Sequence, residues 1–166
     1  MNSKYHILWI DDEWDVMTSF KKHCLFEYQM ELHPFKTQKE GLDDYAKHPD
    51  FYEAVILDAK VLDESEREVA NVSSLQKAVM RIKEQFSDLP YFISTGQPDL
   101  LSDEMFKSFF PHYYEKNTGD EKLCQDIIKT IEGTPNRQIA NKYPELFGKL
   151  QSPIYEEMLS IIKIHE

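Results

Sequence analysis

The sequence predicts a doubly wound α/β fold: a five-stranded parallel sheet followed by a C-terminal helical extension. Short apolar runs alternate along the chain with segments whose apolar residues recur at helical spacing. Strict alternation of this kind favours right-handed crossovers and a sheet that helices cover on both faces. The third apolar run, Ala54 to Leu57, is continuous, as expected of a strand buried on both sides.

The individual elements follow from these patterns in order. Strands are predicted at residues 5–10, 30–35, 54–57, 91–94 and 113–114. The first helix is predicted from Trp14 to Tyr28, and the pair Thr37 and Glu40 has the spacing of a capping box that opens the second. Ser102 is a candidate cap for the fourth helix. Residues 60–73 are polar and predict a long loop.

The length of 166 residues suits one packed domain with a short appendage. We place the domain at residues 1–133, because Thr134-Pro135 after Gly133 is a typical helix stop and turn. Residues 134–166 carry two further apolar stripes at helical spacing. They predict a helical extension, or a connector leading to an output domain outside this sequence.

Charge and cysteine content exclude several classes of function. The 30 acidic and 19 basic residues give a formal charge of -11, which repels nucleic acid phosphates and anionic membranes. We therefore expect no direct nucleic acid binding and no membrane association. Cys24 and Cys124 lie in apolar-periodic stretches and are expected to be buried thiols, not a disulfide. No apolar run is long enough to span a bilayer, so we expect a cytoplasmic protein.

Residues that could take part in catalysis or metal binding follow the predicted strands at their carboxyl ends. Asp11 and Asp12 follow the first strand, Asp58 the third, Thr95 the fourth and Lys116 the fifth. In an open parallel sheet these ends share one edge, where ligands bind. Carboxylates gathered there repel each other unless a hard cation balances them, which indicates a site for Mg²⁺ or Mn²⁺. A carboxylate nucleophile beside a metal and fixed donors is an arrangement suited to phosphoryl transfer.

Four segments at these strand ends carry a family resemblance. Residues 7–12 (ILWIDD), 55–58 (VILD), 90–96 (PYFISTG) and 113–116 (YYEK) resemble the signatures of receiver domains of two-component response regulators. The similarity spans about residues 4–133. It implies a CheY-like, flavodoxin-like fold with strand order 2-1-3-4-5.

The resemblance also implies metal and phosphoryl chemistry. Asp58 would receive a phosphoryl group from a histidine kinase or a phosphotransfer protein. Asp12 would bind the metal directly, Asp11 largely through water, and Asp58 and the backbone carbonyl of Lys60 would complete the protein ligands.

Further residues would sense the phosphoryl group. Thr95 and Lys116 would bond its oxygens, with Ser94 as the alternative to Thr95. Tyr113 would turn inward on activation. The resemblance implies a signalling module, not an enzyme with turnover, and allows a homodimer.

The sequence also departs from the family pattern. Leu62 stands where a proline is usual, no glycine occurs between Gly41 and Gly96, and Asn117 follows Lys116 in place of proline. A trans Lys116–Asn117 bond is therefore expected. These departures keep open a degenerate receiver that acts only as a protein-interaction module. A Mg²⁺-dependent phosphohydrolase is less favoured, because Lys60 stands where a second acid/base carboxylate is needed.

Overall fold

The computed structural model describes residues 3–60, 72–101, 103–143 and 152–165. Its centre is one sheet of parallel strands in the order β2-β1-β3-β4-β5, which confirms the predicted class and order. The strands are β1 (Tyr5–Ile10), β2 (Met30–Phe35), β3 (Ala54–Asp58), β4 (Tyr91–Thr95) and β5 (Tyr114–Glu115).

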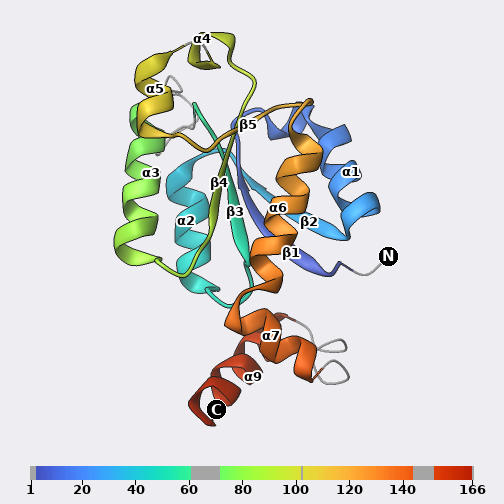
Figure 1. Ribbon diagram of the computed structural model, residues 1–166. Coiled ribbons are helices and arrows are strands. Elements are labelled where there is room, and N and C mark those ends of the chain that lie inside the picture. Colours follow the sequence, from blue (N-terminus) through green and yellow to red (C-terminus); the bar gives the residue numbers. More distant parts are fainter. Residues whose placement is uncertain (1–2, 61–71, 102, 144–151, 166) are drawn as a thin grey trace.

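Helices cover both faces of this sheet (Figure 1). In the described part of the chain they are the 3₁₀ turn η1 (Trp14–Val16), α1 (Thr18–Tyr28), α2 (Gln38–Lys47), α3 (Val72–Gln85), α4 (Pro98–Leu101), α5 (Glu104–Phe109), α6 (Asp120–Glu132), α7 (Pro135–Lys142) and α9 (Ser152–His165). Helices α1 and α6 lie on one face, and α2 and α3 lie on the other.

Alternating side chains of the strands pack into two separate hydrophobic cores, one on each face of the sheet. On β1, Leu8 and Ile10 point toward α2 and α3, where they pack with Leu42 and Leu75. The neighbouring residues of β1, with Trp9 among them, pack toward α1 and α6. Because both faces of each central strand are buried, the strands lack the alternation of polar and apolar residues typical of a half-exposed sheet.

The structure corrects three local predictions. The first helix does not run unbroken from Trp14, because η1 ends before α1 begins at Thr18. Asp103 caps α5, accepting hydrogen bonds from two backbone amides, and the predicted cap Ser102 lies outside the described residues. The last strand begins at Tyr114, which leaves Tyr113 just before it. The Thr37 cap is confirmed: its Oγ1 accepts from the Glu40 amide at 3.2 Å.

The cysteine prediction is also confirmed, since Cys24 and Cys124 are buried free thiols with their sulfurs 3.7 Å apart. Within the described residues, no helix is both long and apolar enough to cross a membrane.

The C-terminal helices pack at the end of the sheet opposite α4 and α5 (Figure 1). Thr134 caps α7, with its Oγ1 accepting from the Arg137 amide. A small apolar cluster joins α7 to α9 through Ala140 and Leu159. The first of the two apolar stripes predicted in residues 134–166 consists of Tyr143, Leu146, Phe147 and Leu150. Only Tyr143 of these is described, so the outcome for the rest lies outside the described residues.

A glycine fixes the turn between β5 and α6. A Cβ atom at Gly119 would lie 2.7 Å from the backbone oxygen of Glu115 and 2.9 Å from its nitrogen. Since backbone atoms cannot step aside, Gly119→Ala is expected to lower the free energy of unfolding by about 1–3 kcal/mol in urea denaturation. Gly133→Ala, where the nearest atoms are at 3.5 and 3.6 Å, is the matched control. Equal losses in the two variants would contradict this reading of the turn.

Candidate functional site

The sheet brings the predicted site residues to one edge. Asp11 follows β1, Asp58 ends β3, Thr95 ends β4 and Lys116 follows β5. These strands are parallel, so their carboxyl ends meet at the edge that α4 overhangs in Figure 1.

Three carboxylates converge at this edge. Asp11, Asp12 and Asp58 each offer an oxygen, and these oxygens all lie within 4.8 Å of one another. Asp11 and Asp58 are buried, whereas Asp12 is half-buried and closer to solvent. Two buried like charges at this separation repel strongly unless a cation stands between them.

Lys116 provides one such cation. Its Nζ donates to Asp11 Oδ2 at 2.8 Å and lies 3.1 Å from Asp58 Oδ1. Burial alone would lower the pKa of Lys116, but the charges of Asp58 and Asp11 outweigh it and leave the pKa above its ordinary value. Among the described residues, the ammonium group of Lys116 is paired with two of these three carboxylates, so this part of the site keeps an excess of negative charge when it is ionised.

Burial and the excess of negative charge raise the pKa values of the carboxyl groups of Asp58 and Asp12. Burial, reinforced by the charge of Asp11, raises the pKa of Asp58 to about 6, although Lys116 pulls it downward. Burial and the neighbouring charges of Asp11 and Glu13 also raise the pKa of Asp12. Additional positive charge at this site would therefore stabilise the ionised forms.

The hydrogen bonds show which oxygens are already used. Asp11 Oδ1 accepts from the Glu13 amide at 2.9 Å, while Oδ2 accepts from Lys116. By contrast, Asp58 Oδ1 is buried and has no well-directed hydrogen bond from any described residue, despite its ion-pair distance to Lys116. A buried oxygen of this kind needs a further partner, and a hard divalent cation with oxygen ligands fits the donor set.

Thr95 and Ser94 are both buried beside Asp58. Ser94 is the register partner of Asp58, and Thr95 is the next residue along β4. Thr95 Oγ1 accepts a hydrogen bond from the Gln97 amide at 3.1 Å, so its own proton is left to donate. This bond fixes the hydroxyl at the start of the β4–α4 loop.

Tyr113 and Lys60 lie at the margins of the site. The ring of Tyr113 is half-buried and packs against Phe106 of α5, with the ring centroids 5.6 Å apart. Lys60 Nζ is paired with Asp99 Oδ2 of α4 at 3.0 Å. Sequence reasoning missed Asp99: its only signal is its position four residues after the end of β4, in the short helix α4, which the sequence analysis did not predict.

Comparison with known proteins shows which solved structures share this fold. No protein-family model matches the chain, and no curated protein matches it. Solved structures do match. A receiver domain protein from Clostridium thermocellum has 21% identity and a TM-score of 0.53, over 77% of this chain and 94% of its own. A CheY-like receiver from Methanospirillum hungatei has 22% identity and a TM-score of 0.53, over 78% and 95%.

A third match comes from the crystal structure of a histidine kinase in complex with a response regulator protein. It has 20% identity and a TM-score of 0.54, covering 76% of this chain and 97% of the matched chain. This chain has the receiver fold.

The receiver fold accounts for the position of the acidic cluster, which sits at the carboxyl edge of the sheet. It does not by itself assign chemistry to Asp58. One departure also has a structural outcome: no described peptide bond is cis, so the Lys116–Asn117 bond is trans as expected. Asn117 itself takes a left-handed backbone conformation with φ of 72°, and its amide donates to Asp120 Oδ1. This turn delivers Lys116 to the acidic cluster without proline.

Proposed function

We propose that this protein is a phosphoacceptor receiver in which Asp58 takes a phosphoryl group from a histidine kinase or a phosphotransfer protein. The observation that carries the proposal is the buried Asp58 oxygen, which accepts no directed hydrogen bond from the part of the chain that the structure describes and lies beside Asp11, Asp12 and Lys116. A solvated surface carboxylate has no need of such surroundings, whereas a nucleophile for phosphoryl transfer does.

The residues suit the transfer as follows. An Asp58 oxygen attacks phosphorus, the bond from phosphorus to the donor's imidazole nitrogen breaks, and a mixed anhydride forms on Asp58. Lys116 already lies 3.1 Å from Asp58 and would pair with a phosphoryl oxygen. Thr95 would donate its hydroxyl proton to another. Because Lys116 is held beside Asp58 before the reaction, it would stabilise developing charge without reorganising.

A bound Mg²⁺ or Mn²⁺ would supply charge neutralisation for the phosphoryl oxygens. Asp12 and Asp58 are its best direct ligands, because both oxygens of Asp11 already accept hydrogen bonds within the chain. Asp11 is therefore better placed to act through water. The backbone carbonyl of Lys60, two residues after Asp58, is the remaining protein ligand in this proposal.

The signal would leave the site through α4, α5 and Tyr113. Movement of Thr95 toward a phosphoryl group would release its bond to Gln97, which precedes α4. Tyr113 packs against α5 and would follow that shift. We expect the module to work in the cytoplasm, to pair with a kinase as the response regulator in the matched complex does, and to form a homodimer if the α4–α5 surface is used for contact.

The proposal predicts one covalent phosphate on Asp58. Acetyl phosphate with Mg²⁺ is expected to add a single phosphoryl group per chain, as measured by intact-mass spectrometry. Chelation of the metal should abolish labelling, since the carboxylates then repel the donor's charge.

Asp58→Asn should give no labelling, whereas Asp43→Asn, which changes a half-buried carboxylate of α2 outside the acidic cluster, should label like wild type. An unlabelled wild type would favour an interaction module. Continuous release of phosphate over many turnovers would favour a phosphohydrolase. Labelling of Asp58→Asn at the wild-type level would also refute the assignment.

A further inference from the structure

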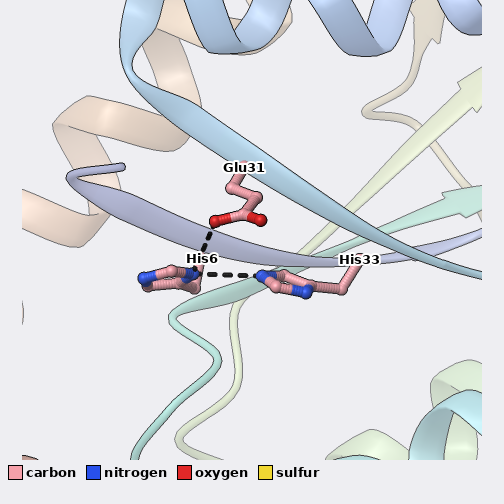
Figure 2. Close-up of side chains that lie close together, drawn as sticks. All are labelled: His6, Glu31 and His33. Carbon is pink, nitrogen blue, oxygen red and sulfur yellow. Dashed lines mark hydrogen bonds and ion pairs between the residues drawn. The ribbon is translucent and has the colours of Figure 1, made fainter. Parts of the chain in front are cut away.

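A second cluster of metal-binding side chains lies far from the acidic site. His6 is near the start of β1, while Glu31 and His33 lie on the neighbouring edge strand β2. His6 and Glu31 are register partners, and His33 is two residues beyond Glu31, so all three side chains share one face of the sheet. Figure 2 shows the two rings side by side with the Glu31 carboxylate above His6.

The ligand atoms are close enough to share one ion. One oxygen or nitrogen from each of the three residues lies within 4.8 Å of the others. His6 Nδ1 is 3.0 Å from His33 Nε2 and 3.6 Å from Glu31 Oε2. In a tetrahedral zinc site with bonds of about 2.0–2.1 Å, neighbouring ligand atoms lie about 3.3 Å apart. The two distances from His6 are each within a few tenths of an ångström of this separation, and the ligand atoms of His33 and Glu31 lie within 4.8 Å of each other.

The two histidines are in the right protonation state. Burial lowers the pKa of His6 to about 4 and also holds the pKa of His33 below its ordinary value. Both rings are therefore neutral near pH 7, and their facing nitrogens hold one proton between them. For a metal ion to use a lone pair from each ring, the ring that carries this proton would change tautomer and hold the proton on its other nitrogen.

The surroundings also orient the cluster. The ring of Phe51 packs against both imidazoles, with centroids 4.4 Å from His6 and 5.2 Å from His33. Ser3 Oγ donates to Glu31 Oε2 at 2.6 Å. In known metal sites, residues that contact the metal ligands but not the metal itself hold those ligands in place. All three ligand residues are half-buried, so an ion can reach them from solvent.

We propose that His6, Glu31 and His33 form a second metal site that binds Zn²⁺, with water as the fourth ligand. Two imidazoles and one carboxylate are a zinc ligand set, whereas the all-oxygen acidic cluster suits Mg²⁺. The different ligand atoms would make one site selective for Zn²⁺ and the other selective for Mg²⁺. Zinc at this site would tie the edge strand β2 to β1 at the end of the sheet opposite Asp58.

Calorimetric titration with ZnCl₂, in buffer with excess Mg²⁺, tests the proposal. We expect one Zn²⁺ per chain, and an affinity lower by at least about tenfold in His6→Asn and in His33→Asn. His112→Asn, which changes an exposed histidine, should match wild type. Asp11→Asn should also bind Zn²⁺ like wild type, because it alters only the acidic cluster.

A second measurement on the wild-type protein avoids any loss of folding in the variants. Zinc titration followed by ¹⁵N NMR of the histidine rings should shift His6 Nδ1 and His33 Nε2 first. The proposal is overturned if the protein does not bind Zn²⁺, if Asp11→Asn abolishes binding, or if the ring nitrogens of His6 and His33 do not respond. Unchanged affinity in folded His6→Asn and His33→Asn would overturn it equally.

Discussion

Asp58→Asn is expected to raise the free energy of unfolding at neutral pH by about 2–3 kcal/mol when divalent metal is chelated. Asp58 is buried beside Asp11 and Asp12, and Lys116 balances only part of their charge. Asparagine keeps a similar shape but removes one of the repelling charges. The residue proposed to carry function thus costs the protein stability in the absence of its ligands.

The pH dependence of this difference follows from the pKa of Asp58. Its folded-state pKa of about 6 lies above the ordinary value of 3.8, so between these values the folded protein binds more protons than the unfolded chain. The contribution of Asp58 to stability therefore falls as pH rises through this window. The advantage of Asp58→Asn should be near zero at pH 4 and reach a plateau above about pH 7.

Urea denaturation of both proteins between pH 4 and pH 8, with a chelator present, measures this profile. Asp43→Asn is the control: hydrogen bonds from Lys39 and Arg81 hold the pKa of Asp43 below its ordinary value, so its loss should not stabilise the protein. Adding Mg²⁺ should narrow the gap between wild type and Asp58→Asn, because the ion binds the folded wild type. A gap that is independent of pH would show that charge repulsion is not its source.

Arg137→Met is expected to lower the free energy of unfolding by about 3–5 kcal/mol, the largest loss predicted for a single side chain here. Arg137 joins α7 to the sheet, donating to both carboxylate oxygens of Glu53 and, at 2.7 Å, to the backbone oxygen of Lys4. Its guanidinium also lies 4.9 Å from the ring centroid of Tyr5. Both members of the ion pair are almost fully buried.

The loss is large because Glu53 would be left without its partner. Burial already raises the pKa of Glu53, and Arg137 is the main group that opposes this. Methionine can fill the apolar volume of the arginine stem but cannot satisfy the carboxylate. Restoring neutrality with a second change, Glu53→Gln, should recover part of the lost stability.

Lys163→Met provides a matched control at the same end of the molecule. Lys163 of α9 pairs with Asp50 at 2.8 Å, but its side chain is substantially exposed, so its loss should cost less than about 1 kcal/mol. Urea denaturation of the three variants decides the comparison. Similar small losses in Arg137→Met and Lys163→Met would mean that α7 is not anchored through Glu53.

Much of the fold and the acidic site could be predicted from local sequence patterns. The strand at 5–10 matches its prediction because a short apolar run flanked by polar residues suffices to define a buried strand. The convergence of Asp11, Asp58 and Lys116 was predictable for a related reason. Parallel strands bring their carboxyl ends to one edge, whatever the details of packing.

Tertiary structure alone decided the contacts between residues distant in sequence. The His6, Glu31 and His33 cluster depends on the register between β1 and β2, and no local pattern specifies a register across separate strands. Arg137 and Glu53 are 84 residues apart, so their pairing follows from where α7 packs. The sequence by itself thus determined which polar side chains stand at the carboxyl ends of the strands, because the position of a strand depends on local periodicity. Only the folded chain decided which side chains meet elsewhere, because register and helix packing are set by the whole core.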